Sequence, residues 1–166
     1  MSGKSHKNRT TKMTEKNPTD ILKEEHKKVL EILNKLEKGM EDRDARLMAE
    51  NISVLEREFN KHSLNKEEKA LFLEIEEFIP REDGPTGVMV AEHKELVELI
   101  KNFKKSLEIN DFEKLNEIGK NIFSILRPHI DKENSMLFMI ADMHLDDKQK
   151  AIVTEKFKKI DSADCD

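Results

Sequence analysis

The sequence predicts an all-α protein: an antiparallel up-down four-helix bundle of two repeated helical hairpins, with a short C-terminal helix and a disordered N-terminal tail. Two observations lead to this fold class. The 166 residues include only 5 Gly and 4 Pro, the residues that interrupt helices, whereas Leu, Lys and Glu are abundant. Apolar residues also recur at alternating steps of three and four residues, which places them on one face of an α-helix.

Composition also limits the organisation of the chain. A charged fraction of 39% against a hydrophobic fraction of 36% is typical of one water-soluble domain. We expect a disordered basic tail over residues 1–17, a four-helix bundle over residues 18–145, and a C-terminal helix and tail over residues 146–166. The tail has no aromatic residue to stack on bases and the rest of the chain is acidic, so no nucleic-acid partner is expected.

Two absences narrow the possible functions. No apolar stretch approaches the roughly 18 residues that a membrane span needs, so we expect no membrane contact and a cytoplasmic location. The single cysteine, Cys165, excludes disulfide frameworks, iron–sulfur clusters and Cys-ligated zinc sites within one chain. Any metal must therefore be held by His and carboxylate side chains. Both a monomer and a homodimer are compatible with the sequence.

The first hairpin is expected to begin at Pro18-Thr19-Asp20, which supplies capping chemistry for a helix. The core-facing stripe of this helix is Leu22, His26, Val29, Leu33, Leu36 and Met40. A second helical pattern runs from about residue 44 to residue 79, and Pro80 ends it. A turn follows at Asp83-Gly84-Pro85.

The second hairpin repeats the first. The stripe of the third helix is Met89, His93, Leu96, Ile100, Phe103 and Leu107, displaced by 67 residues from that of the first helix. Asn110-Asp111 offers an N-cap for the fourth helix, whose predicted inner face is Ile118, Ile122, Ile125, His129, Glu133, Met136 and Ile140. A shorter amphipathic segment over residues 146–160 is expected to pack on the bundle.

The repeat places chemically active side chains at matching depths. Each helix carries one histidine in its apolar stripe, and the second and fourth helices add a glutamate about one turn further on. His62 matches His129 at an offset of 67, but Glu67 matches Glu133 at an offset of 66. One extra residue therefore lies between His62 and Glu67.

Four imidazoles and two carboxylates that converge in a bundle core form a ligand set for iron, manganese or zinc, and suit a pair of metal ions. Ionised glutamates in a core are costly, and Lys and Arg are missing from the same stripes, so a metal is the expected compensating charge. The predicted metal ligands are His26, His62, Glu67, His93, His129 and Glu133. Four neighbouring glutamates are expected in solvent or beside the ligands: Glu24, Glu25, Glu68 and Glu92. His144 is too far along its helix to share the site, and His6 belongs to the tail.

The order His, His-x-x-x-Glu, His, His-x-x-x-Glu resembles the hemerythrin-like family, whose HHE cation-binding domains are non-haem di-iron four-helix bundles. The stretches from His62 to Glu68, from Gly84 to His93 and from His129 to Phe138 look like signatures of that family. The resemblance spans roughly residues 20 to 145. It implies two Fe ions, oxo- or hydroxo-bridged and also bridged by Glu67 and Glu133.

Two departures from that family are visible. Oxygen-carrying hemerythrins have a further histidine where this sequence has Val97, so the sequence is more similar to relatives with four His and two Glu. The second departure is the spacing of five between His62 and Glu67, which overshoots one helical face. We therefore predict a π-bulge near residues 63–66. Without a bulge, that half of the site would be distorted, or Glu68 or solvent would replace Glu67.

The resemblance implies a centre that binds O₂ or NO, as a carrier, scavenger or sensor, or that handles iron. A non-enzymatic role is favoured, with a small diatomic ligand as the partner. The first alternative is a di-iron redox enzyme, such as a peroxidase, ferroxidase or NO reductase, or a protein of iron-centre repair. The second is a structural or zinc-binding helical bundle.

Overall fold

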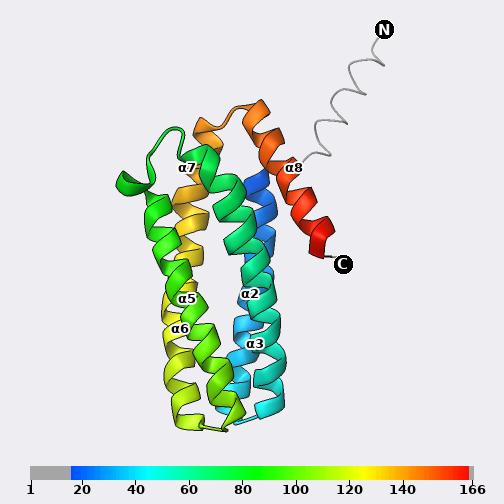
Figure 1. Cartoon of the computed structure of the whole chain (residues 1–166), viewed down its shortest axis with the longest axis vertical. Coiled ribbons are helices and arrows are strands. Elements are labelled where there is room, and N and C mark those ends of the chain that lie inside the picture. The colour runs from blue at the N-terminus through cyan, green and yellow to red at the C-terminus, as the bar shows by residue number, and fades with distance from the viewer. Residues whose placement is uncertain (1–15, 165–166) are drawn as a thin grey trace.

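The computed structural model describes residues 16–164, and these residues are almost entirely helical (Figure 1). No strand occurs between residues 16 and 164. The all-α class is therefore confirmed, and the long helices lie side by side as a helical bundle. The disordered tail that we expected over residues 1–17 falls mostly outside the described residues, as do His6 and Cys165.

Four long arms make up the bundle. The first arm is α2 (Pro18–Glu41). The second arm consists of three consecutive helical segments: α3 (Ala45–Phe59), the π-helix η1 (Asn60–Leu71) and α4 (Phe72–Ile75). A short 3₁₀ turn, η2 (Arg81–Asp83), leads into the third arm, α5 (Pro85–Glu108). The fourth arm consists of α6 (Phe112–Lys132), the π-helix η3 (Glu133–Leu137) and α7 (Phe138–His144). The C-terminal helix α8 (Asp147–Asp164) follows and is longer than the predicted segment.

The arms pack as a closed ring. Helix α2 contacts α3 and α6, and α5 contacts the same two helices from the other side (Figure 1). Helix α8 lies outside this ring, mainly against η1. Its buried side chains, Val153 and Phe157, attach it to the bundle.

The two hairpin turns share one local conformation. Arg43 and Asn110 both adopt the left-handed backbone conformation, each with φ of 52°. Asp44 and Asp111, which follow them, cap the next helix by accepting a hydrogen bond from the backbone N–H three residues later, at 3.0 and 3.1 Å. These pairs are also 67 residues apart, so the repeat extends to the turns.

Two apolar clusters divide the interior along its length. One cluster includes Val29, Phe59, Leu96 and Leu126, and the other includes Leu22, Leu71, Val90 and Leu137. Along the first three arms, the predicted metal ligands fall between the residues of the two clusters, and on the fourth arm they fall between Leu126 of the first cluster and Leu137 of the second. The fold therefore places a polar layer between two dry layers.

None of the helices between residues 16 and 164 combines the length and the hydrophobicity that a membrane-spanning segment requires. The cytoplasmic location stays a prediction.

Candidate metal centre

Six buried side chains converge in the polar layer between the two apolar clusters. They come from α2, η1, α5, α6 and the first residue of η3: His26, His62, Glu67, His93, His129 and Glu133. Each is at most 4% exposed. These are the six side chains that the sequence analysis predicted as metal ligands, and the structure brings all six together.

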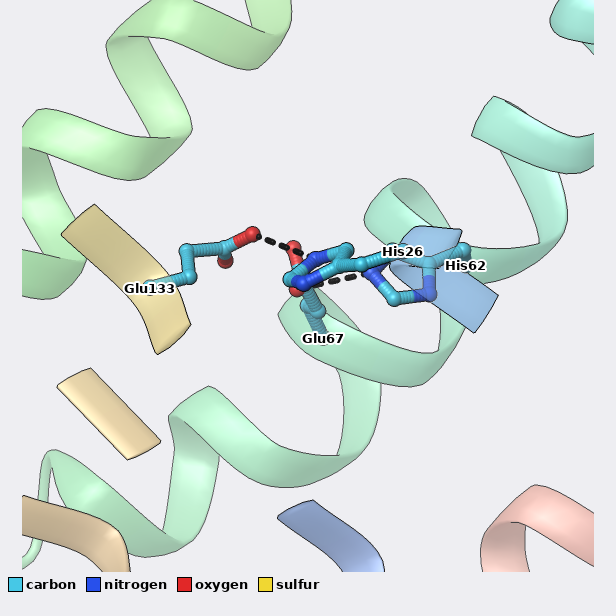
Figure 2. Close-up of side chains that lie close together, drawn as sticks. All are labelled: His26, His62, Glu67 and Glu133. Atoms are coloured by element: carbon cyan, nitrogen blue, oxygen red, sulfur yellow. Dashed lines mark hydrogen bonds and ion pairs between the residues drawn. The ribbon is translucent and has the colours of Figure 1, made fainter. Parts of the chain in front are cut away.

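The six side chains divide into two overlapping groups. His26 and His62 form one group with both glutamates, and His93 and His129 form the other group with the same two glutamates. Within each group, one ligand atom from every residue lies within 4.8 Å of the others. Figure 2 shows how the side chains of the first group point toward one another. The arrangement therefore has two adjacent positions that could each hold a metal ion, and these positions share two carboxylates.

Each glutamate makes its shortest contacts with one histidine of each pair, and Glu67 Oε2 also lies 3.9 Å from His26 Nε2. Glu67 Oε2 lies 3.0 Å from His62 Nε2, and Glu67 Oε1 lies 3.2 Å from His93 Nε2. Glu133 Oε1 lies 3.1 Å from His26 Nε2 and 3.2 Å from His129 Nε2. Both carboxylates are therefore placed to bridge the two positions.

Every histidine of the cluster is also held from outside, at Nδ1. The acceptors are Asn134 for His26 at 2.7 Å, Glu25 for His62 at 2.9 Å, Glu68 for His93 at 2.6 Å and Glu92 for His129 at 2.8 Å. An oxygen acceptor at Nδ1 requires a proton there, so a neutral imidazole presents its Nε2 lone pair to the centre. Histidines that bind metals are commonly oriented by such a partner on the other ring nitrogen.

The neighbouring glutamates thus separate into two kinds. Three of them lie beside the predicted ligands: Glu25, Glu68 and Glu92. The fourth, Glu24, is exposed to solvent and pairs with Lys27. Both expected locations therefore occur. The sequence analysis did not identify Asn134 as a partner of a ligand. Its position directly after Glu133 was the only available signal.

The π-helix η1 explains how a spacing of five residues serves the site. The predicted bulge over residues 63–66 lies inside a longer π-helical stretch, Asn60–Leu71, so the bulge is confirmed and is larger than expected. A π-helix has more residues per turn than an α-helix, so His62 and Glu67 return to one face. Glu67 is fully buried at the centre, and Glu68 instead supports His93 from outside. The alternative with Glu68 as the ligand is therefore disfavoured by the geometry.

A second π-helical segment, η3, was not predicted. It begins at Glu133, and its wider turn shifts the core-facing positions that follow by about one residue relative to a regular α-helix. Leu137 and Ala141 consequently face the core, whereas Met136 is 47% exposed. The expectation that Met136 packs in the core is wrong for this reason.

The interior also contains a cation that the sequence analysis had excluded from the helical stripes. Lys66 is only 1% exposed, and its ammonium group contacts Glu25. The extra residue of η1 changes the register, so a position that appeared to lie off the stripe is buried. The Lys66 ammonium group therefore balances the charge of Glu25. The ion-pair contacts of Glu67 and Glu133 described above are all with histidines.

The two central carboxyl groups have opposite pKa shifts. Burial, together with the nearby charge of Glu133, raises the pKa of Glu67 well above its usual value. Burial also acts to raise the pKa of Glu133, but hydrogen bonds from His129 and His26 outweigh it and hold that pKa well below its usual value. Without a metal, the two carboxyl groups are therefore expected to share one proton.

Two buried oxygens test whether a metal fits. Oε1 of Glu67 and Oε2 of Glu133 have no hydrogen-bond partner in the part of the chain that the structure describes. Buried polar atoms are rarely left in this state, because the lost hydration is costly. Cations at the two positions would satisfy both oxygens, so the residues present fit a metal pair.

A small cavity of about 10 Å³, room for the centre of one water-sized molecule, adjoins the cluster. Its polar lining comes mainly from His26, His62, His129 and Glu133. Val29, Phe59, Leu126 and Ile130 supply the apolar walls. A ligand of two or three atoms matches this space.

His144 does not take part in the cluster. It is exposed at the end of α7, where its ring lies 5.6 Å from that of Phe78. This agrees with the expectation from its distance along the helix.

Comparison with known proteins identifies the family. No curated protein and no solved structure matches the chain. The model of the hemerythrin HHE cation-binding domain matches residues 17–141, more than half of the chain and the whole stretch that carries the six side chains. The chain belongs to the hemerythrin HHE cation-binding domain family.

Proposed function

We propose that this protein binds two iron ions in its core and uses them to bind O₂ or NO, as a carrier, scavenger or sensor, or in iron handling. The observation that carries the proposal is that Glu67 and Glu133 each contact one histidine of both pairs. Two shared carboxylates with two imidazoles on either side form a ligand set for two adjacent cations. The family supplies the expectation that these cations are iron.

The proposal includes the finer topology expected from the repeat, an antiparallel up-down four-helix bundle of two hairpins. Short turns at residues 42–44 and 109–111 favour antiparallel neighbours, because they leave no room for a crossover. Each arm then contributes its histidine at the same depth.

The residues of the chain have separable tasks in this proposal. The four oxygens on Nδ1 orient the imidazoles, and the two glutamates hold the cations together. When bound, a ferrous pair with an open coordination position supplies the site for a diatomic ligand. The apolar cavity walls exclude water and limit the size of what enters.

Gas binding by the reduced protein tests the proposal. We expect the iron-loaded protein, after anaerobic reduction, to change its visible absorption on exposure to O₂ or NO and to recover when the gas is removed. Absorption that does not respond to either gas would contradict the proposal. Catalytic turnover of peroxide, ferrous iron or NO would favour the redox-enzyme alternative, and a colourless protein that holds only zinc would favour the structural one.

A further inference from the structure

Lys66 connects the C-terminal helix with the outer side of the metal centre. Its Nζ contacts Oε2 of Glu25 on α2 and lies 2.8 Å from Oδ1 of Asp161 on α8. It also lies 5.5 Å from the ring centroid of Phe157, a buried residue of α8. A lysine that is 1% exposed is costly unless it is paired, so both carboxylates stabilise it.

The contacts continue from Glu25 to a predicted metal ligand. Oε1 of Glu25 accepts a hydrogen bond from His62 Nδ1 at 2.9 Å, while Oε2 of the same carboxylate faces Lys66. Asp161, Lys66, Glu25 and His62 thus form one continuous chain of polar contacts. This chain begins on α8 and ends at the imidazole whose Nε2 faces the centre.

The internal repeat supplies a comparison within the same molecule. Lys132 Nζ lies 2.7 Å from Glu92 Oε2, and Glu92 Oε1 accepts from His129 Nδ1 at 2.8 Å. Within residues 16–164, no hydrogen bond or ion pair joins these residues to α8, and the Lys132 side chain is 38% exposed. An exposed ion pair contributes little because water competes with it, whereas the buried Lys66 is held by its surroundings.

We propose that Lys66 and Asp161 are positioning residues for the metal centre, and that α8 holds Glu25 against His62. The two metal positions are then inequivalent: the position at His26 and His62 depends on α8, and the position at His93 and His129 does not. The inference rests on the proposed metal centre and concerns how the chain shapes it.

The physical reason lies in the exposure of Glu25, whose side chain is 24% exposed. Without the Lys66 ammonium, its carboxylate gains more from turning toward water than from staying on one imidazole. His62 then loses the acceptor that keeps its proton on Nδ1 and its Nε2 lone pair toward the centre. Loss of such an outer partner lowers metal affinity by about 10- to 100-fold.

Titration of the full metal-free chain with Co(II) alone tests the proposal, with visible absorption reporting each bound ion. We expect Lys66→Met to weaken one of the two binding steps by about tenfold or more and to change the other by less than about twofold. The matched variant Lys132→Met, at the exposed counterpart, is expected to change both steps by less than about threefold. Equal effects of the two variants, or no effect of Lys66→Met beyond a lower melting temperature, would overturn the proposal.

The variant Asp161→Asn tests the role of α8 separately. It also keeps the proposal testable if Lys66→Met does not fold. Asp161 is half-exposed and also lies 3.2 Å from Lys61 Nζ, so this variant leaves the core unchanged. We expect it to weaken the same Co(II) step by about threefold or more, whereas Glu155→Gln, at an exposed position of α8, has no effect. Unchanged binding in Asp161→Asn would overturn the role of α8.

Proton exchange at His62 Nδ1, followed by NMR, separates failure of this inference from failure of the proposed function. A wild-type chain that binds no Co(II) would contradict the metal centre itself. In that case, faster exchange in Lys66→Met than in Lys132→Met would still support the positioning chain, and equal exchange would overturn it.

Discussion

His93 Nε2 and His129 Nε2 lie 3.2 Å apart in the buried centre of the bundle. Each ring is hydrogen-bonded through Nδ1 to a glutamate outside the cluster, Glu68 and Glu92 respectively. If both Nδ1 atoms carry the proton, two lone pairs face each other at this distance. Only a proton or a cation between them relieves the repulsion, so this contact is a direct structural sign of a site built for a positive charge.

Removal of a bridging carboxylate should affect both metal positions. We expect Glu67→Ala to weaken binding of both ions by about 100-fold or more, because Glu67 contacts a histidine of each pair. The matched variant is Glu68→Ala, which removes only the outer partner of His93 and should cost about tenfold. Metal titration of both variants is the measurement. A larger loss in Glu68→Ala than in Glu67→Ala would contradict the assignment of Glu67 as the ligand.

The metal-free protein should lose stability as pH rises. The folded pKa of Glu67 is raised well above 4.5 by burial and by Glu133. Burial lowers the pKa of His93, but the adjacent carboxylates of Glu67 and Glu68 outweigh this and raise it above 6.5. A raised folded pKa contributes stability that is present below the unfolded pKa and is lost as pH rises through the folded pKa.

The lowered pKa of Glu133 makes stability depend on pH in the opposite direction. Its stabilising contribution, however, is lost only as pH falls below 4.5. Between about pH 6 and about pH 8, we therefore expect the melting temperature of the metal-free protein to fall by about 3 °C or more. The metal-loaded protein should fall less, because its ligands hold no proton to lose. Thermal unfolding at several pH values checks this, and a rising melting temperature of the metal-free protein would contradict it.

Asn134 should be required for the orientation of His26. It is the one neutral side chain among the four acceptors on Nδ1, at 2.7 Å from the ring. We expect Asn134→Ala to weaken metal binding by about tenfold, and Asn134→Asp to retain it, since an oxygen acceptor remains. Ser135→Ala, at the next and exposed position, is the control. Equal affinities of Asn134→Ala and the control would show that this hydrogen bond has no role.

The extra residue of η1 should be dispensable. Deletion of the half-buried Asn65 leaves His62-Ser63-Leu64-Lys66-Glu67, the spacing that His129 and Glu133 already have. We expect this deletion variant to keep both metal ions and to melt within about 4 °C of wild type. Deletion of Asn121, exposed in the regular helix α6, should abolish binding because it rotates His129 and Glu133 by about 100°. Loss of metal binding in the Asn65 deletion would contradict the interpretation of η1 as an accommodated insertion.

The convergence of the six side chains and the helical arms were predictable because the repeat constrains both. Each of the four amphipathic helices carries a histidine at the same depth on its apolar face. These histidines therefore meet in the core whatever the details of helix packing. The bulge between His62 and Glu67 was predictable for the same reason, since the offset changes from 67 to 66 there.

The remaining features depend on contacts between elements distant in the sequence. Lys66 becomes buried because η1 is π-helical and because α8 covers it, and neither condition is visible in the local pattern. The second π-helix, η3, leaves the spacing from His129 to Glu133 at four, so no offset reveals it. Asn134 acts on His26 across 108 positions of sequence, a distance over which local patterns carry no information.

The number of metal ions per folded chain tests the bridged pair most directly. The metal-free protein is loaded anaerobically with ferrous iron, excess metal is removed, and iron and protein are quantified in the same sample. We expect two irons per chain in the wild type, because Glu67 and Glu133 each serve both positions. One iron per chain, or none, in a correctly folded protein would contradict the bridged di-iron centre.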